Sequence, residues 1–405
     1  MNFVTDGKEG YHEGKPGARG RKMDLVLMKE DLVFGVKLAS YALGTRSSMP
    51  ILSGLKMEPT GSGLRLSATD LERAVQCEIP VENHGEEETV VLNGAILSQI
   101  ASRLPADDRV SLKRESEDGN VVKLRCGEAL FDLPTLPVED YPEIPPLPPD
   151  KIATLRIDLF HRGLEQTAFA ALKAGETTRL SLTGVDLVLK ADGLKMVATN
   201  GYRLAMKSIG AEEVLEEGEY LIEAGVLSDL DRVLSQLQAD TVDVYKGSGQ
   251  LFFHADGVTF MAKTIGEEFP DFERVIPRDN PISLVFNRTA LLDALLRIEI
   301  TAAEESGAVT FRVTPEESAA RINSSSKNKG EAEERVRLRK VPQGEIEISF
   351  KAEYLIDALK RMASDEVGLW LSDPEKAGLI EPAGDTISPL DEGFIYVCMP
   401  VRLGG

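Results

Sequence analysis

The sequence contains few of the residues on which most catalytic and metal sites depend. Its 405 residues include only four histidines and three cysteines, and no two of these stand at the spacing of a zinc site. Cys77, Cys126 and Cys398 form no disulfide framework, which favours a reducing compartment. Glycine-rich phosphate loops, dinucleotide-binding fingerprints and nucleophile elbows are also missing. We therefore expect no catalytic residues, no metal and no cofactor.

Long hydrophobic runs are missing as well. No apolar stretch is long enough to cross a bilayer, and the first residues do not contain the apolar segment of a signal peptide. The hydrophobic content of 42% is ordinary for a globular protein. These features predict a cytoplasmic protein with no membrane partner.

Positive charge is scarce relative to negative charge. The chain has 46 basic and 67 acidic residues and a net charge of −21, which favours solubility and argues against a uniformly nucleic-acid-binding surface. Acidic pairs such as Glu267-Glu268 and Glu304-Glu305 could hold a metal in an enzyme. A metal-dependent enzyme therefore stays open as an alternative. In so acidic a chain, a solvated surface is the simpler interpretation.

The sequence does contain a domain-sized repeat with an offset of about 130 residues. Segments of the first copy return in the second: Leu52–Gly54 as Leu182–Gly184, Gly63–Asp70 as Gly193–Asn200, and Val91–Ser98 as Leu221–Ser228. Leu25 corresponds to Leu155, and Leu155 to Val285 in a third copy. We predict a disordered extension over residues 1–22 and three domains, at 23–150, 151–278 and 279–405.

Each copy combines two helical patterns with many short strand patterns, so we predict an α+β fold of two helices on antiparallel sheets. Gly44 is predicted to cap the first helix, Asn323–Gly330 to form a solvated loop, and Ile395–Leu403 to be a buried terminal strand. The helices are expected at Lys29–Leu43, Gly94–Leu104, Asp158–Leu172, Ala224–Leu237, Arg288–Ile298 and Lys351–Met362.

One stretch of the second copy has the composition of a small binding pocket. Two strands, beginning near Leu180, are expected to lead into the turn Thr199–Gly201. Tyr202, Arg203 and Leu204 then offer an aromatic face, a charge and an aliphatic surface. An ordinary hairpin turn with surface side chains is the alternative.

Six motifs in order give the chain a resemblance to a known family. They are Arg46–Gly54, Thr69–Glu72, Thr135–Pro142, Val197–Ala205, Phe269–Pro277 and Met399–Leu403. With the threefold repeat, they make the chain similar to the bacterial sliding clamps, the β subunits of DNA polymerase III, over residues 23–403.

This resemblance implies a head-to-tail homodimer that closes into a ring around duplex DNA, with helices lining the hole. DNA contact would be independent of sequence, through Arg46, Arg103, Lys173 and Arg179. The dimer interface would include Phe131 and Leu133 on one subunit and Ile300 on the other. An acidic outer surface is compatible with such a ring.

The resemblance also implies a pocket for short peptide motifs of the Gln-Leu-x-Leu-Phe type. Expected partners are the DNA polymerase III α subunit, the clamp loader, and other DNA polymerases and repair proteins. The matching pocket residues are Leu182, Thr199, Gly201, Tyr202, Arg203, Leu204, Pro270, Val275, Val397 and Met399.

The chain departs from the family at two pocket positions, because Asn200 and Tyr202 stand where the family usually has aspartate and histidine. Positions that assist DNA contact in the family are Glu176, Leu180 and Ser181 here. A DNA sliding clamp that makes the replicative polymerase processive, in the nucleoid, is the resulting prediction. A clamp-type paralogue serving repair or inhibitor resistance is the alternative, besides the metal-dependent enzyme.

Overall fold

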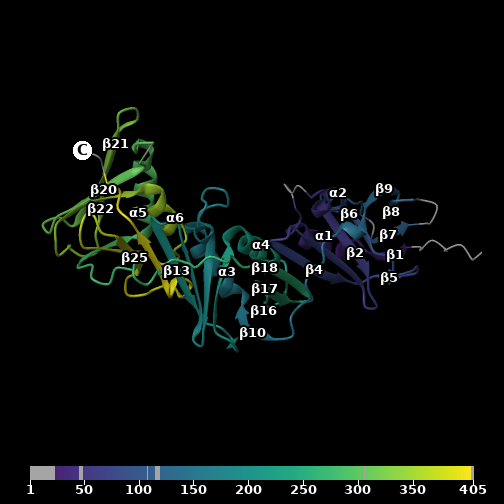
Figure 1. Ribbon diagram of the computed structural model, residues 1–405. Helices are drawn as coiled ribbons and strands as arrows, with labels where there is room; N and C mark the ends of the chain where they lie inside the picture. The colour runs from purple at the N-terminus through teal and green to yellow at the C-terminus, as the bar shows by residue number, and fades with distance from the viewer. Residues whose placement is uncertain (1–22, 45–48, 107, 115–118, 305, 403–405) are drawn as a thin grey trace, which may run out of the picture. The chain divides into compact units, whose positions relative to one another are not determined.

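The computed structural model describes residues 23–44, 49–106, 108–114, 119–304 and 306–402. The chain divides into two compact units, one of Met1–Asp70 with Val75–Ile144 and one of Leu71–Ala74 with Pro145–Gly405. The first repeat falls in the first unit, and the second and third repeats share the second unit (Figure 1).

The described helices are α1 Lys29–Ser40, α2 Gly94–Ala101, α3 Ile157–Thr167, α4 Ala224–Leu234, α5 Arg288–Ile298 and α6 Ala352–Lys360. The strands of the first repeat are β1 Met23–Met28, β2 Gly54–Pro59, β3 Leu64–Thr69, β4 Arg73–Ile79, β5 Glu82–Asn83, β6 Val90–Asn93, β7 Arg109–Arg114, β8 Val121–Cys126 and β9 Ala129–Leu136. Those of the second are β10 Lys151–Arg156, β11 Gly184–Lys190, β12 Gly193–Thr199, β13 Arg203–Ile209, β14 Glu213–Val214, β15 Gly218–Glu223, β16 Thr241–Gly247, β17 Gln250–Ala255 and β18 Val258–Lys263. Those of the third are β19 Ile282–Asn287, β20 Ala308–Val313, β21 Ala319–Ser326, β22 Gly330–Arg337, β23 Ile346–Lys351, β24 Glu366–Leu371, β25 Gly378–Ala383 and β26 Phe394–Cys398.

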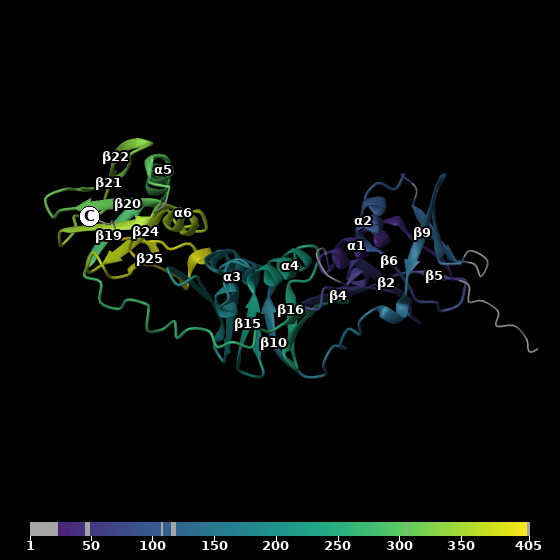
Figure 2. The same cartoon turned by 45° about the horizontal axis from the view of Figure 1, so that its top comes forward.

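The three repeats have one element order. In each repeat, a strand leads into a first helix, four strands follow, and a second helix precedes the last three strands. The two-residue strands β5 and β14 are additions to this plan in the first and second repeats. The predicted fold of three α+β repeats, each with two helices and antiparallel sheets, is confirmed, and Figure 2 shows the paired helices of each repeat beside its sheets.

The six predicted helices are present, but α1 ends earlier than expected and Gly44 is not its cap. Tyr41 caps α1 in the right-handed helical conformation. Gly44 instead donates its N–H to the carbonyl of Leu52 at 2.8 Å, and a Cβ at this position would lie 2.8 Å from Leu52 Cβ. Gly44 is therefore required by a close approach of two backbones, not by a left-handed turn.

Small residues on the first helix of each repeat allow the sheet to approach closely. A Cβ at Gly35 of α1 would overlap Leu66 of β3, and one at Gly163 of α3 would overlap Met196 of β12. The corresponding residue of α5 is Ala294, which is also buried. The repeat thus extends to the packing of helix on sheet.

The second and third repeats are joined through one sheet of eight strands, in the order β15-β11-β12-β13-β26-β25-β24-β19. The terminal strand β26 lies in its centre and pairs with β13 on one side and β25 on the other. The prediction of a buried terminal strand is confirmed, although the strand ends at Cys398. The predicted loop Asn323–Gly330 is wrong in extent, because Asn323–Ser326 belong to β21 and pair with β22.

A buried carboxylate strengthens this junction. Asp391 is 0% exposed, and its oxygens accept hydrogen bonds from Arg162 and Gln166 of α3 at 2.9 Å each. They also accept from the backbone N–H groups of Ala363 and Ser364 at 2.8 and 2.7 Å. Burial alone would raise the pKa of Asp391, but the hydrogen bonds from these donors hold it below its ordinary value.

Replacing Asp391 by alanine should therefore be strongly destabilising. The substitution leaves the Arg162 guanidinium and the Gln166 amide without their acceptor, which costs about 3–5 kcal/mol for a broken buried ion pair. Urea unfolding measures the effect. Asp192→Ala, an exposed turn residue of the same unit, is the control and should change stability by less than about 0.5 kcal/mol. Equal stability of both variants would contradict a structural role for the Asp391 cluster.

Candidate functional site

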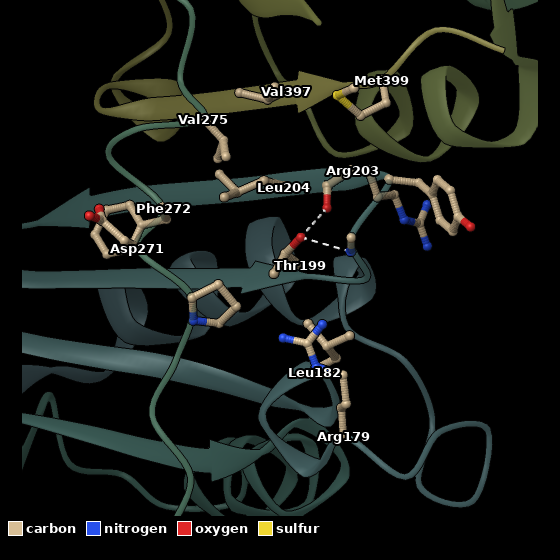
Figure 3. Close-up of a pocket in the computed structure, with 13 residues that line it drawn as sticks. Arg179, Leu182, Thr199, Arg203, Leu204, Asp271, Phe272, Val275, Val397 and Met399 are labelled. Atoms are coloured by element: carbon tan, nitrogen blue, oxygen red, sulfur yellow. Dashed lines mark hydrogen bonds between the residues drawn. The ribbon is translucent and has the colours of Figure 1, made fainter. Parts of the chain in front are cut away.

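An apolar pocket lies on the second and third repeats, where β13 and β26 run side by side (Figure 3). Its volume is about 210 Å³, enough for one or two apolar side chains of a ligand. The structure brings all ten predicted pocket residues together here and adds three others. The lining is Arg179, Leu182, Thr199, Gly201, Tyr202, Arg203, Leu204, Pro270, Asp271, Phe272, Val275, Val397 and Met399.

The turn at one end of the pocket is organised by its own polar side chains. Asn200 Oδ1 accepts hydrogen bonds from the backbone N–H groups of Tyr202 and Arg203 at 2.9 and 3.0 Å. Thr199 Oγ1 donates to the carbonyl of Arg203 at 2.7 Å and accepts from Gly201 N–H at 3.1 Å (Figure 3). Gly201 has φ of +87°, a conformation that favours glycine. Asn200 therefore acts as a turn residue, since its acceptor is already used.

Leu204 and Val397 form the floor of the pocket and belong to a buried cluster that also contains Val197 and Met206. The connecting segment of residues 265–277, which we call the strap, packs over this cluster with Phe269, Phe272 and Ile276. The strap therefore forms one wall of the pocket, and the sheet forms the floor.

The rim of the pocket is apolar and open. Tyr202, Val275 and Met399 are 66%, 52% and 43% exposed, which is high for side chains of this size. Their exposure beside an apolar floor is typical of a surface that receives apolar groups from a partner. Leu182 belongs to a 3₁₀ turn, Leu180–Thr183, where the sequence predicted a strand.

The charge of Arg203 does not face the pocket. Its guanidinium donates to Asp357 Oδ2 of α6 and to the Phe169 carbonyl, both at 2.7 Å, and its side chain is only 9% exposed. The sequence correctly predicted that Arg203 lines the pocket, but the expectation of a charge available to a ligand is wrong.

The residues predicted to contact DNA lie at separate places. Arg103 is exposed just after α2, and Lys173 is exposed after α3. Arg179 lies in the lining of the apolar pocket, together with Asp271 and Phe272, which the sequence analysis did not select. Phe272 lies within the motif Phe269–Pro277, so the sequence could have indicated it as a pocket residue. Arg46 lies outside the described residues.

The residues predicted for the dimer interface differ in exposure. Ile300 follows α5 and is 69% exposed, and Phe131 of β9 is half-buried. Leu133 is 7% exposed, so its side chain packs mostly within its own unit. Along Ala129–Pro134, β9 pairs with β8 but with no other strand of the described chain.

Neither a metal cluster nor a membrane span is found in the described part of the chain. No group of three or more histidine, cysteine, aspartate or glutamate side chains is arranged to hold a metal ion there. No described helix is long and apolar enough to cross a membrane.

Family models match the chain three times in succession. The N-terminal domain of the DNA polymerase III beta subunit matches residues 23–145, the central domain 154–271 and the C-terminal domain 273–402. The chain belongs to the DNA polymerase III beta subunit family. Its pocket is thus assembled from residues of the central and C-terminal family domains.

Curated and solved relatives agree with this assignment. The beta sliding clamp of Staphylococcus aureus is 26% identical over 387 residues, which are 94% of this chain and 99% of the relative. The structure is similar to that of a DnaN sliding clamp from Pseudomonas aeruginosa bound to griselimycin, with a TM-score of 0.85 and 27% identity. It is equally similar to the sliding clamp of Bacillus subtilis, with a TM-score of 0.85 and 26% identity. Both alignments cover 94% of this chain and 100% of the other.

One buried carboxyl group of the second repeat does not line the pocket. Asp186 of β11 is 0% exposed, and neither of its oxygens accepts a hydrogen bond from the described residues. Its register partners are the apolar Val197 and Leu221. Burial, together with the nearby carboxyl of Glu219, raises the pKa of Asp186 to about 7.

The stability of the clamp should therefore depend on the protonation of Asp186. Because its pKa is higher in the folded than in the unfolded chain, the folded state retains a proton between about pH 4 and 7, and stability falls as the pH rises through this range. Asp186→Leu should thus stabilise the protein by on the order of 3 kcal/mol at pH 8 and by much less at pH 5. Urea unfolding of both proteins at both pH values measures the difference.

Glu219→Gln provides a partial version of the same test. It removes the neighbouring charge but keeps Asp186. The loss of unfolding free energy between pH 5 and pH 8 should therefore become smaller without disappearing. A stability difference between the parent chain and Asp186→Leu that is the same at pH 5 and pH 8 would contradict the raised pKa.

Proposed function

We propose that this protein is a DNA sliding clamp for the replicative DNA polymerase. The observation that carries the proposal is the succession of three clamp-family domains over residues 23–402, separated only by residues 146–153 and residue 272. The family is a non-catalytic processivity factor, so the protein is not an enzyme. Its task is to keep a polymerase on its template. The domain limits 23–150, 151–278 and 279–405 are part of this proposal.

In the proposed assembly, two chains form a closed head-to-tail ring of six domains around duplex DNA. A heterologous interface between repeated units can close into such a ring. The interface would join β9, whose residues 129–134 have one described strand partner, to the third repeat around Ile300 and β22. β22 is likewise the outer strand of its four-stranded sheet, in the order β22-β21-β20-β23. Unpaired strand edges of this kind readily accept a further strand.

DNA would be held loosely and without sequence preference. The proposed contacts are Arg46, Arg103, Lys173 and Arg179, which can attract phosphates in a salt-dependent manner. Arg179 also lines the apolar pocket.

The apolar pocket would capture short peptide motifs of partner proteins. Leucine and phenylalanine side chains of a Gln-Leu-x-Leu-Phe motif fit its apolar floor, and burial stabilises each by roughly 1.5–3 kcal/mol. The proposed partners are the DNA polymerase III α subunit, the clamp loader, other polymerases and repair proteins. The paralogue with a repair role remains the second candidate, favoured by Tyr202, which changes the shape of the rim.

Charge at the pocket rim should weaken peptide binding. Val275→Asp should raise the Kd of a fluorescein-labelled Gln-Leu-Ser-Leu-Phe peptide at least about tenfold, because a carboxylate would have to be desolvated beside the peptide's apolar side chains. Fluorescence anisotropy measures the Kd. Leu215→Asp is the matched control, since Leu215 is 58% exposed in the same unit but does not line the pocket. Equal affinity of both variants would show that the pocket is misassigned.

Retention on circular DNA tests the clamp itself. After loading, the parent protein should remain on a nicked circle through gel filtration and should be released when the circle is linearised. Ile300→Glu should give monomers that are not retained, because a charge would be buried in the dimer interface. Val341→Glu, at a residue 56% exposed in the same repeat, is the control and should behave like the parent. Equal retention of the parent protein on circular and linear DNA would refute encirclement.

A further inference from the structure

Two successive residues of β13 contact different parts of the second unit. Side chains alternate along a strand, so Leu204 and Arg203 point to opposite faces. Leu204 belongs to the apolar cluster beneath the strap, whereas the Arg203 guanidinium contacts Phe169, after α3, and Asp357 of α6. Arg203 therefore links the pocket to the helical side of the sheet.

A run of stacked cations and rings continues from Arg203. Its guanidinium lies 5.3 Å from the Phe169 ring centre and 4.5 Å from that of Tyr354. Phe169 carries a second cation, Arg361, at 4.1 Å. Contacts of this kind are attractive, because the face of an aromatic ring carries partial negative charge. Phe169 is thus shared between one arginine that lines the pocket and another that does not.

Arg361 lines a second cavity, which has a volume of about 440 Å³. Phe169 and the exposed cation Lys173 also line it, next to the first turn of α4. Glu165 and Glu223 are present as well, so the cavity is not uniformly basic. Two cations on the helical side are nevertheless positioned for an anion such as a phosphate group.

Asp357 pairs with both arginines through different oxygens. Its Oδ2 accepts from Arg203 at 2.7 Å, and its Oδ1 lies 3.6 Å from the Arg361 guanidinium. Because Arg361 already lines the second cavity, an anion bound there would draw its guanidinium away from Asp357 and leave this carboxylate to Arg203 alone. It would also remove one of the two cations from the Phe169 ring, so that Arg203 would be held more firmly beneath the pocket.

We propose that the peptide pocket is coupled to the Lys173–Arg361 cavity through Arg203, Phe169 and Asp357, so that a DNA phosphate bound in the cavity tightens peptide binding. This inference rests on the proposed function. A coupling between two sites is reciprocal, so a bound peptide also strengthens phosphate binding in the cavity. Phe169 and Asp357 are positioning residues, because neither lines the peptide pocket.

The test compares peptide affinity with and without DNA. The Kd of the labelled Gln-Leu-Ser-Leu-Phe peptide is measured for the full-length protein alone and with a saturating 20-base-pair duplex, at constant salt. The duplex should lower the Kd about fivefold, within the usual range of coupling between sites. Arg361→Gln should lower the Kd by a similar factor without DNA, and the duplex should then have little further effect.

Two further variants keep the test decisive. Phe169→Leu retains an apolar side chain but loses the ring, so peptide should bind while the effect of DNA disappears. Lys190→Gln removes a cation that pairs with Glu217 on the surface, and it should leave both the affinity and the DNA effect unchanged. The same Kd for the parent with and without duplex, or a full DNA effect in Phe169→Leu, would overturn the coupling. A peptide that binds none of the proteins would instead refute the proposed function.

Discussion

The pairing of β13 with β26 is the constraint on which the described site depends. The register sets Leu204 opposite Val397 and Arg203 opposite Cys398. Because neighbouring side chains alternate, one pair forms the floor of the apolar pocket and the other faces the helices. A shift of β26 by one residue would turn Val397 towards the helices and Cys398 towards the pocket, and the apolar floor would be lost. The pocket and the junction of the two repeats are therefore one structure.

Much of this arrangement could be predicted from the sequence because it is encoded locally or by repetition. The helices follow from apolar periodicity, and α5 was predicted to the residue. The turn at Gly201 follows from the preference of glycine for positive φ. The ten pocket residues were reached through motifs shared with a known family, and the structure brings them together. Composition alone would have left them as a hairpin turn and core residues.

The rest could not be predicted, because it depends on partners far away in the chain. The acceptors of Arg203 lie 34 and 154 positions away, and nothing near Asp391 in the sequence indicates that Arg162 pairs with it. Gly44 was misread for the same reason, since its constraint comes from the backbone of Leu52. Arg179 was predicted only as a DNA contact, because its place beside Pro270 of the strap depends on the fold.

The same long-range pairings bear on how the protein would hold DNA. Cations on the helices are few, and several are already engaged: Arg162 with Asp391, Arg288 with the carbonyls of Leu359 and Ser364, and Arg297 with Glu334. A phosphate would have to compete with these partners, so each available contact is weak. A chain of net charge −21 would then gain little affinity from local contacts. In the proposed assembly, retention on DNA would therefore come from closure of the ring and would depend on the dimer interface more than on the lining.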